Sequence, residues 1–492
     1  MISQVIKHLS KSSLYYGSGQ AVRRFFSIVT APIMTRIFSP SDYGVISLIL
    51  TTAAFAGLVI GIGINAGVFR HYYEMNDMNR RVLLFSGITS QMTIIVSMVL
   101  VLSLFAGQIS SLIFGTTKFT GIIILALIQI PIVELFEHFM TLLRYQNKPK
   151  YFFVFSSIQL VLNLGFMLLF VVYFRLGIPG VFLGIISAYI IPIFMLLFKL
   201  KKYYSFALNL GFVKNCIAFS LPLIPGWLMN MYLMQSNRFF LQAFHTSEEV
   251  GLYSIGFSIA GIASMVIGVF FLAWDPIAMK LINDKPHHYV YDSIARLFLF
   301  VTSIVILGVT FFAKEVLIIL TTEKYYPAFV YPGVIAFGIM TFYFNYFLGQ
   351  GIIISKKTIY ESVSRIMGAV VASLIYIKLI PQFGGLGAAF GLIAGFCTAS
   401  LFLFVFSSKL YRIPYKINRI SITYGFTFFV IIFYLYISED NYNVNISIII
   451  LKLFALMTIT FISAFIVFTR SELKNGKDII LNRLHSQVAA IR

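Results

Sequence analysis

Long runs of apolar residues, separated by short polar segments, extend along almost the whole chain. A helix needs roughly 20 mostly apolar residues to cross the hydrocarbon core of a bilayer, so the pattern predicts an all-α integral membrane protein. The connections between the runs are too short to form domains of their own. The fourteen expected spanning helices lie at 13–38, 43–68, 82–106, 119–144, 152–175, 178–198, 213–242, 250–273, 293–320, 328–354, 358–380, 385–408, 418–437 and 446–469.

The charges of the connecting segments test this set of helices independently, because cytoplasmic loops are rich in Lys and Arg. With the N-terminus placed in the cytoplasm, the cytoplasmic segments hold twenty-five of these residues and the external segments hold five. An odd number of missed helices would break this alternation, and no break occurs along the sequence. We therefore expect both termini to lie in the cytoplasm.

The composition is typical of a chain embedded in lipid, since 59% of the residues are hydrophobic and 11% are charged. A net charge of +20 would suggest nucleic-acid binding in a soluble protein, but no polar domain carries a basic stripe that could receive a nucleic acid. The sequence contains neither the phosphate-binding loop of a primary pump nor an acid–base or metal-ligand constellation. We therefore expect that the protein is not an enzyme and that it binds no metal or organic cofactor.

The first predicted helix carries two arginines near mid-membrane depth, Arg23 and Arg24, beside a polar stripe that includes Gln20 and Ser27. A charge in the bilayer core costs several kcal/mol, so such residues are functional candidates. The planar guanidinium group binds two phosphate oxygens at once and stays charged when it is desolvated. The pair could therefore bind a phosphate-bearing substrate, or it could form ion pairs with carboxylates elsewhere in the bundle.

The candidate partners lie on the fourth predicted helix, where Glu134, Glu137 and His138 share one face. Carboxylates in a membrane interior exchange protons near neutral pH, so Glu134 and Glu137 could couple transport to a proton or sodium gradient. Alternatively they only neutralise the arginines of the first helix. The sequence leaves these two interpretations open.

Prolines mark the expected hinges. Pro32 should bend the first helix, and Pro222 and Pro225 interrupt the seventh helix within the segment Ser220-Leu221-Pro222-Leu223-Ile224-Pro225-Gly226. Broken helices are where alternating-access transporters tend to bend. Arg238, near the outer end of the same helix, could contact substrate or only extend to the membrane surface.

Three other charged positions have local explanations. Arg296 lies close enough to the predicted cytoplasmic surface to count as a topology charge. Lys452 is expected to extend its amine to the outer surface. Arg365 follows Glu361 by one helical turn, a spacing that favours a local ion pair.

A short internal repeat divides the chain. Ser39-Pro40-Ser41-Asp42-Tyr43-Gly44-Val45-Ile46-Ser47 and Thr246-Ser247-Glu248-Glu249-Val250-Gly251-Leu252-Tyr253-Ser254 each place an acidic turn and a glycine at the start of an apolar span. Two six-helix lobes and an additional helix pair fit this register. The expected units are an N-terminal lobe at 1–212, a C-terminal lobe at 213–408, the helix pair at 409–470 and a basic cytoplasmic tail at 471–492.

Four motifs resemble signatures of the polysaccharide-biosynthesis family, whose members include the Wzx-type oligosaccharide flippases of the multidrug/oligosaccharidyl-lipid/polysaccharide (MOP) exporter superfamily. They are the segments 39–44, 220–225, 250–254 and 380–389. The resemblance implies a V-shaped pair of six-helix lobes around a cationic cavity. It also implies alternating-access transport of an undecaprenyl-pyrophosphate-linked oligosaccharide, such as an O-antigen, capsule or exopolysaccharide repeat unit, across the bacterial inner membrane.

The resemblance further implies that Arg23 and Arg24 bind the pyrophosphate and that the last two helices cradle the lipid tail. Arg238 is a further candidate for the cationic cavity from its position in the seventh helix. Asn237 departs from the family pattern, which often has Asp-Arg there, and an acidic coupling group is lost with it. The implied partners are the lipid-linked glycan, membrane lipid, a polysaccharide polymerase and a chain-length regulator. The alternatives are a multidrug or other small-molecule exporter of the same superfamily and a non-transporting protein of envelope assembly.

Overall fold

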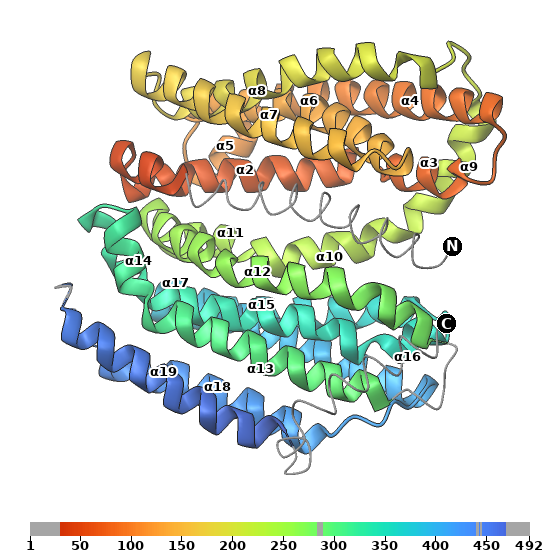
Figure 1. The fold of residues 1–492 in the computed structure, drawn as a ribbon. Coiled ribbons are helices and arrows are strands. Elements are labelled where there is room, and N and C mark those ends of the chain that lie inside the picture. The colour runs from red at the N-terminus through yellow and green to blue at the C-terminus, as the bar shows by residue number, and fades with distance from the viewer. Residues whose placement is uncertain (1–29, 283–288, 439–441, 443–444, 469–492) are drawn as a thin grey trace.

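The computed structural model describes residues 30–282, 289–438, 442 and 445–468, and Figure 1 shows their arrangement. These residues form helices and connecting loops, with no strand among them. Arg23 and Arg24 lie outside the described residues. The prediction of an all-α membrane protein is confirmed, since twelve of the described helices are long and apolar enough to cross a bilayer.

The first group of helices lies uppermost in Figure 1, and we call it the N-lobe. Polar residues cap the N-termini of two of its helices. Ser39 forms a capping box with Asp42 at the start of one helix, and the side chain of Asn76 caps another. The group comprises α2 (Pro40–Ile60), α3 (Ile64–Tyr72), α4 (Asp77–Leu104), α5 (Ala106–Phe114), α6 (Thr120–Tyr145), α7 (Pro149–Met167), the π-helix η1 (Leu168–Tyr173) and α8 (Ile178–Leu200).

A short 3₁₀-helix, η2 (Lys201–Tyr203), leads into a helix that is broken into several parts: α9 (Leu210–Ser220), the 3₁₀-turn η3 (Leu221–Leu223), α10 (Ile224–Gln235) and α11 (Asn237–Phe244). The lower group in Figure 1, which we call the C-lobe, contains α10 and α11 together with later helices. These are α12 (Ser247–Leu281), α13 (Tyr289–Phe311), α14 (Ala313–Leu320), η5 (Glu323–Val330), α15 (Tyr331–Leu348), α16 (Gln350–Ile354) and α17 (Ile359–Leu410).

Helix α17 folds back on itself at Gly384, whose φ of 52° and ψ of −128° are not helical. The two arms pack closely, because a Cβ atom on Gly368 would lie 2.5 Å from the carbonyl oxygen of Gly395. The arms correspond to the predicted spans 358–380 and 385–408. The total of fourteen spans is not established, because most of the first one, 13–38, lies outside the described residues.

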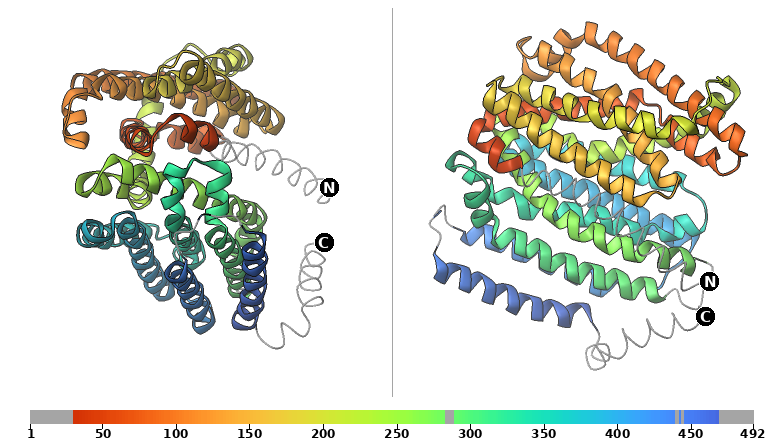
Figure 2. Two further views of the ribbon diagram at one scale, coloured as in Figure 1. Left: turned by 90° about the vertical axis from the view of Figure 1, so that its left-hand side faces the viewer. Right: turned by 45° about the horizontal axis from the view of Figure 1, so that its top comes forward.

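The last two helices, α18 (Ile417–Ile437) and α19 (Ile446–Val467), pack against α13. Figure 2 shows this pair in blue at the edge of the C-lobe that lies farthest from the N-lobe. Large apolar side chains cover the outer side of α19, as at Leu451 and Phe461, which are both 66% exposed. Such a surface suits contact with lipid tails rather than with water.

A hydrogen bond from Arg296 and an ion pair of Lys452 attach α19 to the C-lobe. The Nε of Arg296 lies 3.0 Å from Oδ2 of Asp292, and its Nη1 donates to the carbonyl of Val467 at 2.8 Å. Arg296 is thus buried within the protein, where its partners join α13 to α19. Lys452 pairs with Glu315 on α14 at 2.5 Å instead of extending freely to the outer surface.

The basic loops gather at one end of the bundle. The hydroxyl of Tyr73 donates to the carbonyl of Tyr145, and the amine of Lys148 donates to the hydroxyl of Tyr203 at 2.7 Å, so the three basic loops of the N-lobe meet. We call this the basic end, and it lies to the right in Figure 1, where α3, α9 and α16 are labelled. The opposite end carries α14 and the turn of α17.

Candidate functional site

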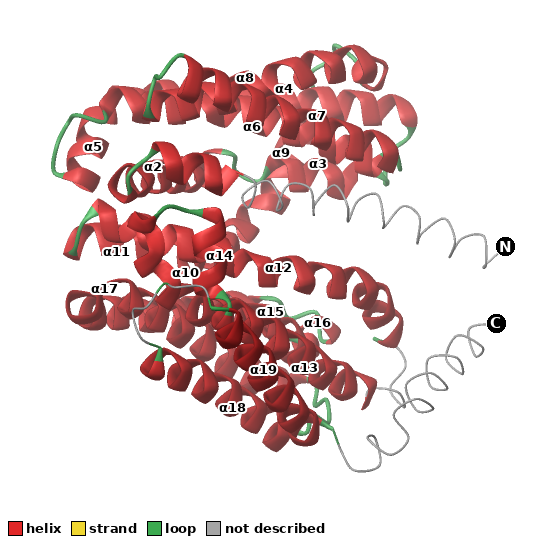
Figure 3. Ribbon diagram, turned by 60° about the vertical axis from the view of Figure 1, so that its left-hand side comes forward, coloured by secondary structure: helices red, strands yellow, loops and turns green. Residues whose placement is uncertain are grey.

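The two copies of the internal repeat touch each other where α2 meets α12, which is the most extensive contact between the lobes. A Cβ atom on Gly44 would lie 1.7 Å from the carbonyl oxygen of Ser247, and one on Gly251 would lie 1.9 Å from that of Pro40. The contact is therefore reciprocal, since each glycine faces the residue four positions before the other. Only glycine permits two backbones to approach so closely. Figure 3 shows α2 in the upper group of helices and α12 in the lower group.

One helical turn further along, the repeat supplies a matching pair of serines. The hydroxyl oxygens of Ser47 and Ser254 lie 2.8 Å apart. Arg238, from α11, donates from Nε to Ser47 at 3.0 Å and approaches Ser254 at 3.3 Å. Its guanidinium group also lies 4.7 Å from the ring centre of Phe257. We call the contact made by Gly44, Gly251, Ser47, Ser254 and Arg238 the seam.

Arg238 is an unusual member of this cluster. The residue is 6% exposed, and its Nη1 is buried with no hydrogen-bond partner among the described residues. A buried cation normally has a carboxylate or several strong acceptors around it. The structure therefore places Arg238 inside the interface between the lobes, where its partners among the described residues are two serines and an aromatic face rather than a carboxylate.

The seam is reinforced near the end opposite to the basic loops. The hydroxyl of Tyr325 donates to the carbonyl of Phe38 at 2.9 Å, and that of Thr322 donates to the carbonyl of Thr35 at 3.2 Å. The hydroxyl of Thr35 in turn approaches the carbonyl of Leu320 at 3.3 Å. These bonds join η5 and the end of α14 to the chain just before α2, so the lobes are tied together at this end.

The broken helix connects the two lobes physically. Its first part, α9, packs against the N-lobe, where the amide of Gly67 donates to the hydroxyl of Ser220 at 3.1 Å. Its later part, α10, packs against α17 in the C-lobe, where the hydroxyls of Tyr232 and Ser373 lie 2.5 Å apart. Pro222 lies in η3 and Pro225 in the first turn of α10. Both predicted hinge prolines thus lie where the chain passes from one lobe to the other, and the third, Pro32, lies within the described helical segment 30–37.

The two predicted coupling carboxylates lie on α6 within the N-lobe. Glu134 accepts a hydrogen bond at 3.3 Å from the amide of Gln91 on α4, and both Glu134 and Glu137 are half-buried. His138 is fully buried, and its Nδ1 lies 2.7 Å from Oδ1 of Asn65. The contacts of Glu134 are thus made within the N-lobe, whereas those of Arg238 are made across the seam.

Sequence reasoning missed the serines and glycines of the seam as functional residues. Gly44, Ser47, Gly251 and Ser254 occupy equivalent positions in the two repeat copies, so the signal was present in the sequence. The repeat shows that two segments are alike, but it does not show that they touch. The sequence also indicated the ion pair between Glu361 and Arg365, which the structure confirms, but it did not indicate the pocket that this pair lines.

Comparison with known proteins identifies the family of this chain. The family described as polysaccharide biosynthesis protein matches residues 9–282, which is more than half of the sequence. The chain belongs to this family. No curated protein matches the sequence.

Solved structures with the same fold are transporters. A lipid II flippase, MurJ, in an inward closed conformation superposes with a TM-score of 0.72 over 95% of this chain and all of its own, at 15% identity. A MATE-family multidrug resistance transporter of the MOP superfamily, in an inward-facing conformation, gives 0.59 over 82% of this chain and 96% of its own, also at 15% identity. The MATE transporter VcmN of Vibrio cholerae gives 0.56 over 83% and 98%, at 16% identity.

These likenesses establish the fold, which the chain shares with a lipid II flippase and with MATE transporters. The polysaccharide biosynthesis family and this fold are those of flippases and transporters rather than of catalytic enzymes. The protein is therefore a multi-pass membrane protein of the polysaccharide biosynthesis family with a transporter fold.

Proposed function

We propose that this protein flips an undecaprenyl-pyrophosphate-linked oligosaccharide from the cytoplasmic to the outer leaflet of the bacterial inner membrane by alternating access. The seam carries the proposal, because it joins the two lobes through a reciprocal backbone contact beside a helix that bends between them. Family membership supports a polysaccharide precursor as cargo. The likeness to a lipid II flippase supports a lipid-linked one. The basic end would face the cytoplasm.

In this mechanism the seam opens and closes as a unit. Separation of Gly44 from Gly251 would remove Ser47 from Arg238, whereas Arg238 and Ser254 belong to the same lobe and would stay together. The guanidinium group would then lose its N-lobe acceptor and become available to an anion between the lobes. Opening thus provides a pyrophosphate ligand that is hidden while the seam is closed.

Other parts of the mechanism follow from the sequence. We propose that Arg23 and Arg24 hold the pyrophosphate between the lobes, and that Glu134 and Glu137 couple the movement to H⁺ or Na⁺. A polysaccharide polymerase and a chain-length regulator would use the glycan after it is delivered. A multidrug exporter of the same superfamily is the competing function, but a cavity lined by arginines would repel cationic drugs.

A disulfide across the seam provides the first test. The hydroxyl oxygens of Ser47 and Ser254 are 2.8 Å apart, so cysteines at these positions lie within reach of a disulfide bond. We would introduce Ser47→Cys and Ser254→Cys after replacing Cys216 and Cys397 with alanine. Proteoliposomes would contain a fluorescent polyprenyl-pyrophosphate-linked sugar, and quenching from outside would report its movement between leaflets.

Oxidation should stop flipping, and reduction should restore it. Each single-cysteine variant is the control and should flip equally under both conditions. Undiminished flipping by a quantitatively cross-linked protein would contradict alternating access at the seam. Export of a cationic dye without flipping of the lipid would favour the multidrug function instead.

Glycine substitution provides a second test of the same contact. Gly44→Ala places a methyl group 1.7 Å from the carbonyl oxygen of Ser247, so the seam should not close and flipping should fall at least about tenfold, roughly 1.4 kcal/mol. The matched control is Gly425→Ala in α18, where a Cβ atom has nothing within 4 Å. Equal flipping by the two variants would remove the functional role of the close approach.

A further inference from the structure

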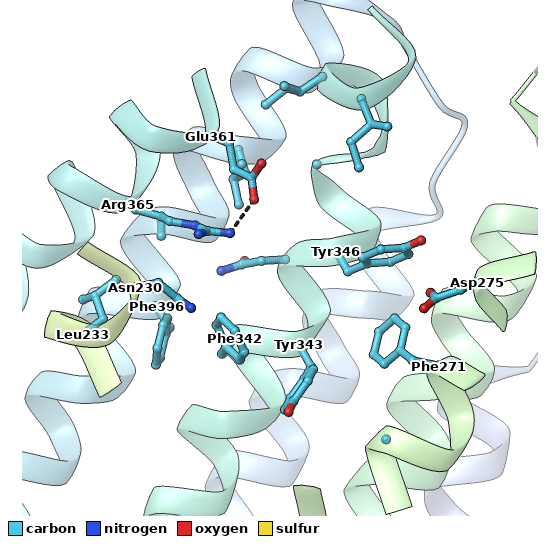
Figure 4. Close-up of a pocket in the computed structure, with 17 residues that line it drawn as sticks. Asn230, Leu233, Phe271, Asp275, Phe342, Tyr343, Tyr346, Glu361, Arg365 and Phe396 are labelled. Atoms are coloured by element: carbon cyan, nitrogen blue, oxygen red, sulfur yellow. Dashed lines mark hydrogen bonds and ion pairs between the residues drawn. The ribbon is translucent and has the colours of Figure 1, made fainter. Parts of the chain in front are cut away.

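The C-lobe contains a cavity of about 360 Å³ between α10, α12, α15 and α17. This volume lies at the small end of the roughly 300–1,000 Å³ typical of small-ligand sites. We call it the C-lobe pocket and define it by its polar residues Asn230, Asp275, Asn345, Glu361 and Arg365. Figure 4 shows Asn230, Glu361 and Arg365 on one side of the pocket and Asp275 on the other.

Aromatic side chains form much of the remaining wall. Phe271 comes from α12, Phe342, Tyr343 and Tyr346 from α15, and Phe396 from the second arm of α17. An aromatic face is electron-rich and attracts weakly polarised C–H groups. A ligand that presents C–H groups on one face and hydroxyl groups at its edge would satisfy both kinds of wall.

Most polar groups of the pocket are held by neighbours. The guanidinium of Arg365 donates to the carboxylate of Glu361 and also points toward the carbonyl of Gly226, 3.5 Å away. The amide oxygen of Asn345 accepts from the hydroxyl of Ser400. These side chains are thus fixed before any ligand arrives, and a pre-ordered site loses less entropy on binding.

Asn230 differs from these neighbours. Its Oδ1 atom is buried and has no hydrogen-bond partner among the described residues. A buried amide oxygen without a donor costs free energy, and a ligand hydroxyl would supply that donor. The unsatisfied atom therefore marks the position of a hydrogen-bond donor in the occupant.

The charges of the pocket limit the class of ligand. Two carboxylates, those of Asp275 and Glu361, face one guanidinium, which is already paired, so a phosphate or diphosphate would be repelled. A free organic cation would have to compete with the same guanidinium for Glu361. Among the described residues no group of three His, Cys, Asp or Glu side chains could hold a metal ion.

We infer that the C-lobe pocket binds one sugar ring of the glycan. A pyranose presents C–H groups to an aromatic wall and hydroxyl groups to carboxylate, guanidinium and amide groups. The inference rests on the proposed function, because it assigns part of the proposed cargo to a place in the protein. The pyrophosphate would then bind elsewhere, at the arginines between the lobes.

The chain's two tryptophans allow binding to be measured directly. Trp274 lies between Phe271 and Asp275 in the sequence, and Trp227 follows Gly226. We would place the full-length protein in nanodiscs, which avoids sugar-based detergents, and titrate glucose, galactose, N-acetylglucosamine and rhamnose while recording tryptophan fluorescence. At least one sugar should give a saturable change.

The Asn230→Leu variant should weaken this binding by about threefold to tenfold, the value of one hydrogen bond. It should fold, because the lost oxygen has no protein partner among the described residues. The matched control is Asn163→Leu, which replaces a buried asparagine of α7 outside the pocket and should bind as the wild type does. No saturable response to any sugar, or equal affinity of Asn230→Leu and wild type, would overturn the inference. A response to tetraphenylphosphonium alone would overturn it as well.

The same variants separate this inference from the proposed function. If the protein flips the lipid in proteoliposomes but Asn230→Leu binds sugar as tightly as the wild type does, the sugar site in the pocket is rejected and the flippase function is retained. Sugar binding that depends on Asn230, combined with no flipping of any lipid-linked sugar, would support the pocket and reject the flippase.

Discussion

Two arginines are buried in the C-lobe, and their surroundings are opposite. Arg296 is 2% exposed and has the carboxylate of Asp292 at 3.0 Å and the carbonyl of Val467 at 2.8 Å. Arg238 is 6% exposed and has serine hydroxyls, the face of Phe257 and one nitrogen without a hydrogen-bond partner among the described residues. The two guanidinium groups are therefore buried to a similar extent, but within the described part of the chain only that of Arg296 is compensated by a carboxylate.

The surroundings of the two arginines distinguish a structural charge from a functional one. Asp292 also accepts a hydrogen bond from the backbone amide of Lys416 at 2.7 Å, so the Arg296 pair joins α13 to the start of α18 and the end of α19. Arg238 joins the two lobes, and its acceptor Ser47 lies on the lobe that has to move away. A fully compensated cation holds helices together, whereas an incompletely compensated one remains able to bind an anion.

The largest expected effect on stability is that of Arg296→Met. Removal of one partner from a buried ion pair leaves the carboxylate of Asp292 uncompensated and should cost about 3–5 kcal/mol. The double variant Asp292→Leu/Arg296→Met should recover much of that loss. Thermal unfolding of the purified protein in detergent would measure the stability of both variants. A single variant as stable as the wild type would show that the pair of Arg296 and Asp292 does not stabilise the protein.

The Arg238→Met variant should show the reverse pattern. It removes an incompletely satisfied cation while keeping an unbranched apolar stem, so the free energy of unfolding should change by no more than about 1 kcal/mol. Flipping should nevertheless fall at least about tenfold, because the proposed pyrophosphate ligand is lost. A loss of stability as large as that of Arg296→Met would instead make Arg238 a structural residue.

A smaller change in the same cluster is Ser47→Ala. It removes the N-lobe acceptor of Arg238 but keeps Ser254, so the closed seam should weaken by roughly 1 kcal/mol, about fivefold in the equilibrium between closed and open. Cysteine accessibility at the seam would measure the shift. Unchanged accessibility would show that the glycine contact alone keeps the seam closed.

The smallest effect is expected at an exposed arginine. Arg70 pairs with Glu74 in the loop after α3, where hydrogen bonds from His71 and Arg70 lower the pKa of Glu74. The contribution of the pair is present above the ordinary pKa of Glu74 and is lost as the pH falls through the lowered value. Arg70→Gln should raise this pKa without a measurable change in melting temperature or flipping, and NMR titration of Glu74 would follow it.

Much of the architecture could be predicted because lipid constrains a sequence strongly. A bilayer requires long apolar helices, and loop charge fixes their alternation, so most spans appear at the predicted positions. Gly384 is an example, since the predicted boundary between spans at 358–380 and 385–408 is where α17 folds back. The prolines of helix seven were similarly predictable, because Pro222 and Pro225 cannot continue a regular helix.

The chemistry of individual charges was less predictable. The position of Arg296 in the sequence indicated a topology charge near the cytoplasmic surface, and only the packing of α13 against α19 showed that this arginine also forms a buried ion pair. The spacing of Glu361 and Arg365 predicted their ion pair, because i and i+4 share a helix face. It could not predict Asn230 beside them, because that residue comes from α10, more than a hundred positions earlier in the chain.

By itself, the sequence determined that this protein is a multi-pass helical membrane protein with a repeated glycine motif and a proline-broken seventh helix. Apolar length, loop charge and backbone restriction are local properties, and each can be read from a short segment. The tertiary structure was needed to show that the two glycines meet, that Arg238 joins two serines across the lobes, and that the buried Oδ1 of Asn230 in the pocket has no hydrogen-bond partner among the described residues. These features depend on which distant segments share a surface, and hydrophobic patterning leaves that choice open because lipid-facing and buried helices are both apolar.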